Sequence, residues 1–129
     1  MADEVIWPIE QIPGSDNVFM RAHRMHFRNG ELQPGVFRQH GDGMSVDWEK
    51  YSTPLETKNR AARPVDNAVI GVRASDIRGL HNLRVQHKPE HANQAHTIVT
   101  GLPAPGTPEL VEVRLKLLRI STILLPLSS

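Results

Sequence analysis

The stretch Met44-Ser45-Val46-Asp47-Trp48 is the clearest strand in the sequence, because its three apolar residues alternate with two polar ones. A period of two is typical of a β-strand that has one face in a hydrophobic core. We therefore expect Ser45 and Asp47 to face solvent or a cleft. Together with the helix signals further along the chain, this strand predicts an α+β fold with a small mixed or antiparallel sheet and two main helices.

Helix signals stand at two places. Thr53-Pro54-Leu55-Glu56 joins an N-cap threonine, a proline at the first helical position and a glutamate three residues after the cap, which predicts a helix to about Ala62. Thr107-Pro108-Glu109 repeats the cap and the proline. The residues after it fit a helix and a strand equally well, and the start signal and the length favour a helix.

Further strands are expected where short apolar runs lie between turn signals, and Asn29-Gly30 predicts a tight turn. Ser75-Asp76 is expected to cap a short helical turn that ends at Gly79. The apolar run from Ile120 to Leu127 is interpreted as buried core or a subunit contact. The predicted strands cover residues 18–23, 67–73, 83–87 and 95–100.

Length and composition predict one domain. A chain of 129 residues is of single-domain size, and residues 1–129 are expected to form one core, with an extended segment over 1–16 and a rigid Pro/Gly connector over 101–108. The acidic start Met1-Ala2-Asp3-Glu4 does not resemble a secretory signal. The longest apolar stretch is too short for a membrane span, so we expect a cytoplasmic protein.

Histidine and arginine are concentrated early in the sequence, at Arg21, His23, Arg24, His26 and Arg28. Guanidinium and imidazole groups bind anions, and a histidine pair can share general acid and base catalysis of phosphodiester cleavage without a metal. The alternative is a solvated edge strand whose polar side chains have no further role. The cluster favours an anion-binding site.

Two more polar groups occur later in the chain. One contains Asp42, Ser45 and Asp47. Asp47 can orient a histidine, or Ser45 and Asp47 can satisfy backbone donors at a strand end. A late cluster contains three histidines with a carboxylate and an amide, and His96 in it is interpreted as a cleft residue held by Asn93 or a backbone carbonyl. Three histidines and a carboxylate can hold zinc, but their spacing is not specific, so no metal site is predicted. The late cluster is His87, Glu90, His91, Asn93 and His96.

Several familiar sites lack support in the sequence. The chain has no cysteine, which excludes disulfides and thiolate chemistry. It also lacks the glycine-rich motifs of P-loop and Rossmann nucleotide sites and the G-x-S-x-G elbow of α/β-hydrolases. Its six aromatic residues are scattered, which disfavours a base-stacking platform for single-stranded nucleic acid. No cofactor is predicted.

The segments Arg21-Ala22-His23, Ser45-Val46-Asp47 and Asn93-Gln94-Ala95-His96 resemble those of a family of small uncharacterised bacterial proteins over roughly residues 15–120. The resemblance implies a stand-alone bacterial cytoplasmic domain with no established activity. A fainter similarity is to ADP-ribosyltransferase-like and RES-type domains, which grip NAD between small sheets. Their later acidic motif is absent, so no catalytic residue is carried over from them.

These observations lead to one hypothesis and one rival. In the first, the early strand and the late segment meet across the sheet, so that His23 and His96 act as acid or base beside Arg21 in a cleft for a nucleotide or phosphodiester, a small molecule or part of a nucleic acid. The ligand-binding residues would be Arg21, Arg24, His26, Ser45, Asp47, His87 and Asn93. The rival is a non-enzymatic interaction module that docks on a second copy or a larger protein through residues 110–127.

Overall fold

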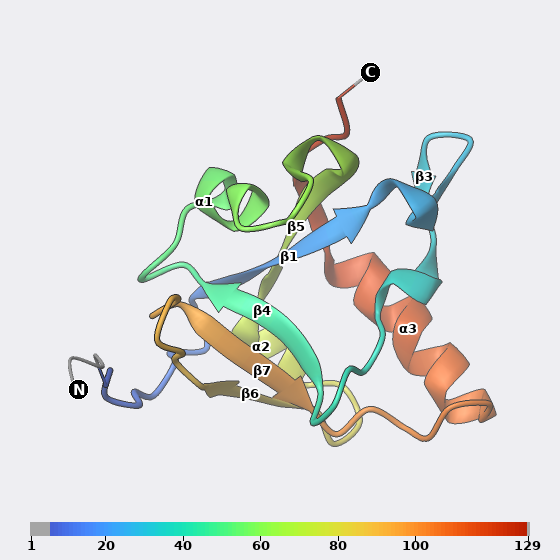
Figure 1. Ribbon diagram of the computed structural model, residues 1–129. Helices are drawn as coiled ribbons and strands as arrows, with labels where there is room; N and C mark the ends of the chain where they lie inside the picture. The colour runs from blue at the N-terminus through green and yellow to red at the C-terminus, as the bar shows by residue number, and fades with distance from the viewer. Residues whose placement is uncertain (1–5, 129) are drawn as a thin grey trace.

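Eight strands, three α-helices and three 3-10 turns succeed one another along residues 6–128, the part of the chain that the computed structural model describes (Figure 1). The acidic start on which the expectation of no signal sequence rests lies outside this part. No helix within it is long and apolar enough to cross a membrane. The strands and helices are β1 Asn17–His23, β2 Phe27–Arg28, β3 Glu31–Leu32, β4 Met44–Trp48, α1 Pro54–Asn59, β5 Asn67–Arg73, α2 Ala74–Arg78, β6 Arg84–His87, β7 His96–Thr100, α3 Pro108–Ile120 and β8 Thr122–Leu125.

Six of the strands form one antiparallel sheet in the order β6-β7-β4-β1-β5-β8, which confirms the predicted α+β class. Alternation along β1 gives the sheet two different faces. Val18, Met20 and Ala22 join the hydrophobic core with residues of α2 and α3. Arg21 points to the other face, where its guanidinium reaches the backbone of α1. Helices therefore cover both faces, and α1 lies on the polar one.

Strand β1 pairs very differently with its two neighbours. All seven of its residues pair with β5, from Asn17–Arg73 to His23–Asn67. Only two pairs join it to β4, Val18–Trp48 and Phe19–Asp47. Beyond the second pair the two strands diverge, as Figure 1 shows to the right of their labels. The sheet is thus open between β1 and β4 over the second half of β1.

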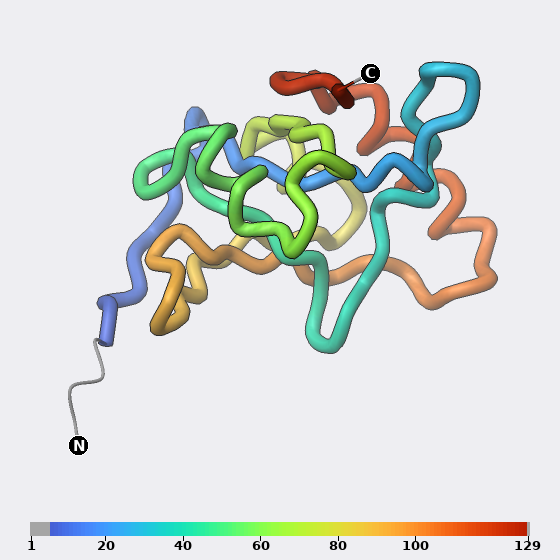
Figure 2. The backbone as a smooth tube through the Cα atoms, turned by 45° about the horizontal axis from the view of Figure 1, so that its top comes forward, coloured from blue at the N-terminus to red at the C-terminus, as the bar shows by residue number. Residues whose placement is uncertain are grey.

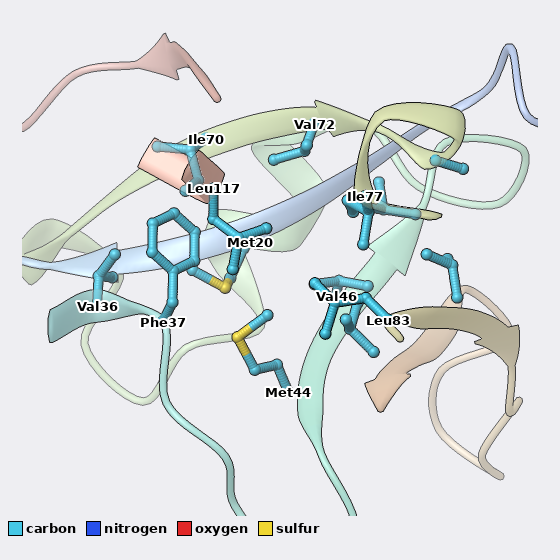
Figure 3. Close-up of a cluster of buried hydrophobic side chains, with 14 of the residues drawn as sticks. Met20, Val36, Phe37, Met44, Val46, Ile70, Val72, Ile77, Leu83 and Leu117 are labelled. Carbon is cyan, nitrogen blue, oxygen red and sulfur yellow. The ribbon is translucent and has the colours of Figure 1, made fainter. Parts of the chain in front are cut away.

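Apolar side chains fill the core side of this opening. Phe37, only 1% exposed, comes directly after a 3-10 turn at Pro34–Val36 and belongs to the same core cluster as Met20 of β1 and Met44 of β4 (Figure 3). The backbone carbonyl of Phe37 accepts a hydrogen bond of 2.8 Å from Arg114 of α3. The segment that occupies the opening is therefore fixed from behind by the last helix.

The first two predicted helices form where they are expected, but the end of the first and the cap of the second differ from the prediction. Thr53 and Glu56 form the complete capping box of α1, with both reciprocal hydrogen bonds present. The helix ends at Asn59 instead of Ala62, because the chain turns at residues 60–63 to reach Pro64, and the residue before a proline disfavours helical angles. The short helix α2 begins at Ala74 after Arg73, so Ser75 is inside the helix and is not its cap.

At the C-terminal end, the helix prediction is right. Of the two interpretations of the apolar run, buried core is wrong, and a subunit contact stays a prediction. Thr107 caps α3, as the start signal predicts. The apolar run after α3 is not buried core, because it forms β8, an edge strand paired with β5, in which Ile123 and Leu124 are 46% and 40% exposed. β8 is the last strand in the sheet order, so only its β5 side is paired, and its other side is an open edge.

Two projections complete the described chain. Asn29 and Gly30 have φ angles of 53° and 79° and turn the β2–β3 hairpin, as the Asn-Gly pair predicts. A second turn, through Gly41, connects the 3-10 turn to β4 and is closed by a bridge between His40 and Gly43. Figure 2 shows both turns extending from the body of the molecule. Residues 6–12 and 101–106 contain neither helix nor strand, in accord with the predicted extended segment and connector.

Candidate functional site

A hollow of about 790 Å³ lies over the opening between β1 and β4, and most of the predicted site residues line it. Its wall comes from both diverging strands, residues of η1 (Arg24–His26), the turn before β4, helix α1 and the loop before β7. The polar lining residues are Arg21, His23, His26, Arg38, His40, Ser45, Asp47, Thr57, Arg60, Asn67, Glu90, Asn93 and His96.

The hollow has a cationic lining. Three arginines and four histidines line it, against two carboxylates, Asp47 and Glu90. One arginine, Arg60, is engaged by Asp47. Arg21 donates a hydrogen bond of 3.0 Å to the carbonyl of Thr57, a neutral group that fixes the guanidinium without cancelling its charge. Arg38 lines the hollow from the segment before β4 and is exposed. Positive charge therefore remains available from β1 and from the segment before β4.

Asp47 organises one end of the hollow. Its side chain is nearly inaccessible to solvent, and it accepts three hydrogen bonds of 2.8 Å, from the Thr57 hydroxyl, the Arg60 guanidinium and the Asn93 amide. A buried carboxylate is tolerated when a cation and several donors satisfy it. Asp47 therefore does not orient a histidine and does not satisfy backbone donors. It fastens α1 and the loop before β7 to the sheet.

Ser45 of β4 and His96, the first residue of β7, form a pair through their side chains. The Nε2 atom of His96 lies 3.1 Å from the Ser45 hydroxyl, and its Nδ1 atom lies 2.7 Å from the carbonyl oxygen of Lys88. A carbonyl oxygen only accepts, so Nδ1 carries the proton and Nε2 presents its lone pair to the hydroxyl. The expectation that a backbone carbonyl holds His96 is confirmed. The Glu90 carboxylate lies further off, 3.9 Å from Nδ1.

The early histidines have other environments. Nδ1 of His23 accepts a hydrogen bond of 3.0 Å from the backbone N–H of Met25, so the proton of the neutral ring is on Nε2. Burial lowers the pKa of His26, and the charges of Arg38 and His23 lower it further. His23 is therefore arranged to donate a hydrogen bond from Nε2, whereas His26 favours its neutral form.

Two predicted site residues lie elsewhere. His87 is buried on the opposite face of the sheet, where Nδ1 accepts from the N–H of Glu10, Nε2 lies 2.7 Å from the Gln94 carbonyl and the ring packs on Trp48. It borders a separate hollow of about 580 Å³, but both of its nitrogens are engaged. Arg24 pairs with Asp66 and does not line the hollow over the opening. Neither residue joins the predicted cleft.

Several residues of the hollow were not predicted from the sequence. Arg38 and His40 reach it from the segment before β4, and Arg60 and Thr57 reach it from α1 and the residue after its end. One signal was available, because Arg38-Gln39-His40 repeats the R-x-H pattern of Arg21-Ala22-His23. The role of Arg60 depends on a contact with Asp47 that no local pattern announces.

Two further sources of evidence, metal-binding groups among the described residues and similar proteins, give no result. Within residues 6–128, no three histidine, aspartate or glutamate side chains form a group that can hold a metal ion. Comparisons with protein-family models, curated proteins and solved structures gave no match. The function is therefore argued from the chemistry of the hollow alone.

Proposed function

We propose that the hollow between β1 and β4 binds an anionic ligand, with a nucleotide or another phosphoric ester as the class of ligand. The observation that carries this proposal is that Arg21 and Arg38, from two separate segments of the chain, line one hollow together with His23 and His40. Charged hydrogen bonds from guanidinium groups are among the strongest that proteins make to phosphate. The ligand would lie between Arg21-Ala22-His23 and Arg38-Gln39-His40.

The histidine tautomers give the hollow one acceptor and one donor. His96 presents a lone pair on Nε2, as a general base does, and His23 presents an N–H on Nε2 that can donate a hydrogen bond to an anion. A ligand bound in this hollow would lie against a wall that contains both histidines. The proposed binding site therefore includes the two histidines for which a catalytic role is predicted.

Titration calorimetry tests the proposal, with AMP, inorganic pyrophosphate and a short single-stranded oligonucleotide as probes. We expect binding of at least one probe, and a loss of affinity of about tenfold or more in Arg21→Gln and in Arg38→Gln, because a hydrogen bond to a charged group contributes about 1.5–3 kcal/mol. Arg119→Gln is the matched control, since Arg119 is exposed on α3 and does not line the hollow. Binding that is absent, or equal in all variants, contradicts the proposal.

A second candidate function rests on β8. This edge strand presents Ile123 and Leu124 to solvent at one end of the sheet, and a strand edge with exposed apolar side chains is a template for pairing with another strand. We propose that a second copy of the chain pairs there. Light scattering should give twice the monomer mass, and Ile123→Lys should return it to the monomer. A monomer at every concentration excludes self-association.

A further inference from the structure

The pairing of Ser45 with His96 has the geometry of an activated nucleophile. The hydroxyl lies within hydrogen-bonding reach of a histidine nitrogen, at 3.1 Å, and the far side of the ring is held at 2.7 Å by the Lys88 carbonyl. A nucleophile, a base and a group that orients the base are the three parts that nucleophilic catalysis by serine requires. Ser45 is exposed in the hollow, so a substrate can reach it.

The backbone fixes the histidine more firmly than its side-chain bond alone. Lys88 donates its N–H to the carbonyl of His96 at 2.9 Å, while its own carbonyl faces Nδ1. Asn93 ties the intervening loop to Asp47 and accepts from the N–H of Ala95. The ring is thereby held in the tautomer that can take the proton of Ser45.

The open sheet also supplies a donor for developing negative charge. The N–H of Trp48 donates to Ala95 before β7, and that of Glu49 donates to Asn17 of β1. Backbone groups alternate sides along an antiparallel strand, so the N–H of Ser45 is directed toward β1. The pairing of β1 with β4 has ended there, at Phe19–Asp47. That N–H is therefore a donor that developing negative charge can use, and Arg21 lines the same hollow.

We propose that Ser45 is the nucleophile and His96 the general base in the hydrolysis of a carboxylic ester that carries an anionic group. This proposal rests on the proposed anion binding only in one respect, namely that Arg38 would hold the anionic group of the ester. Ser45 Oγ bonds to the carbonyl carbon as its proton passes to Nε2 of His96. The bond to the alcohol oxygen breaks, and the alcohol takes that proton. Water then attacks the acyl group through His96, releases the acid and restores the Ser45 hydroxyl.

A carboxylic ester is preferred to a phosphodiester for the covalent step. The pair brings the Ser45 hydroxyl to 3.1 Å from an imidazole nitrogen, with no group that could hold a metal ion beside it among the described residues. The negative charge of a phosphodiester repels a nucleophile, and phosphoric esters are among the slowest substrates to hydrolyse without catalysis. A carbonyl carbon is the electrophile that such a pair attacks most readily.

The absence of cysteine from the chain allows a test that needs no substrate. Ser45→Cys introduces a single thiol beside His96, and its alkylation by neutral iodoacetamide reports how far the histidine ionises it. We expect alkylation about tenfold faster in Ser45→Cys than in Ser45→Cys/His96→Gln at pH 7. Ser75→Cys, on the exposed surface of α2, is the control and should not respond to His96→Gln. Equal rates with and without His96 overturn the proposal.

Two further measurements address the serine itself and the substrate. A fluorophosphonate probe should phosphonylate Ser45 with loss of hydrogen fluoride, seen as one adduct by mass spectrometry, which Ser45→Ala abolishes and Ser75→Ala does not. No adduct, or an adduct elsewhere, overturns the proposal. Mono-p-nitrophenyl succinate should be hydrolysed faster than p-nitrophenyl acetate, and Arg38→Gln should remove this preference. Equal rates for the two esters overturn the anionic substrate class.

These tests are independent of the calorimetric test of anion binding. Iodoacetamide and the acetate ester carry no charge, so they report on Ser45 and His96 even where the arginines bind nothing. Binding of AMP or pyrophosphate, in turn, does not require Ser45. Failure of the serine chemistry would leave an anion-binding hollow, and failure of anion binding would leave an activated serine.

Discussion

The two sides of β1 differ in structure and in chemistry. On the β5 side, seven residue pairs and fully buried side chains such as Ile70 make a continuous sheet. On the β4 side, pairing stops after two pairs, and charged and imidazole side chains surround the opening. The continuous backbone pairing of β1 therefore lies on its β5 side, and the open backbone with the candidate chemistry lies on its β4 side. Changes on the two sides should therefore separate the free energy of unfolding from ligand affinity.

The largest effect is expected on the β5 side. Ile70→Ala should lower the free energy of unfolding by about 4 kcal/mol, because removing a fully buried isoleucine leaves a cavity in the core. The affinity of the folded fraction for AMP should not change. Ser45→Ala, on the other side, should leave stability nearly unaltered. Urea denaturation measures both variants, and similar losses in the two would contradict the division.

On the β4 side, Asp47 holds α1 and the loop before β7 to the sheet. Asp47→Asn should lower the free energy of unfolding by about 2–3 kcal/mol. The substitution removes the charge that balances Arg60 and weakens the bonds from Thr57 and Asn93. The cost lies at the lower end of the range for a broken buried ion pair, because the Arg60 side chain is 28% exposed and can turn to solvent. Denaturation in Asp47→Asn and in Asp42→Asn, an exposed control, measures it. Equal stability of the two variants would show that Asp47 does not fasten α1.

A smaller effect is expected at the start of α1. Thr53→Ala removes one half of the capping box and should lower the free energy of unfolding by about 1 kcal/mol. Thr53→Ser keeps the hydroxyl and should recover most of this loss. Thermal unfolding distinguishes the two variants. If Thr53→Ala unfolds at the wild-type temperature, α1 owes its stability to Asp47 and not to its cap.

The smallest effect is expected in the pH dependence of stability, through His26. The pKa of His26 is lowered in the folded protein by burial and by the charges of Arg38 and His23, so the unfolded chain binds a proton more readily. The contribution is fully favourable above the ordinary histidine pKa of about 6.5 and decreases as the pH falls toward the lowered value. The free energy of unfolding should therefore fall less between pH 7 and 5 in His26→Gln than in the wild type. His91→Gln, exposed in the loop before β7, should behave like the wild type.

The elements of this fold could be predicted where their signals are local. The alternation of β4, the capping box of α1 and the apolar run of β5 each lie within a few residues, and each structure agrees with the pattern. β8 was not predicted, because its apolar residues after α3 gain a partner only when β5 is already in the sheet. A pairing between distant segments leaves no periodicity in either one.

The site could be predicted in part for the same reason. His87 and His96 both lie in or beside predicted strands, but His87 pairs with Thr97, so the two histidines face opposite sides of the sheet. A register shift of one residue would exchange those faces, and the sequence does not specify the register. The opening between the strands of Arg21 and Ser45 has Phe37 on its core side, and Phe37 is held there by Arg114 of α3. These segments are far apart in the sequence, so no local pattern predicts the opening.

Anion binding beside β4 can be followed residue by residue in an NMR titration of the ¹⁵N-labelled chain with AMP. The backbone amides of Arg21, Ser45 and His96 should shift as AMP is added, while those of Val72 in β5 and Leu124 in β8 stay in place. Arg38→Gln should reduce the shifts at a given AMP concentration. Shifts centred on β8 or on the hollow beside His87, or no shifts at all at millimolar AMP, would contradict an anion site between β1 and β4.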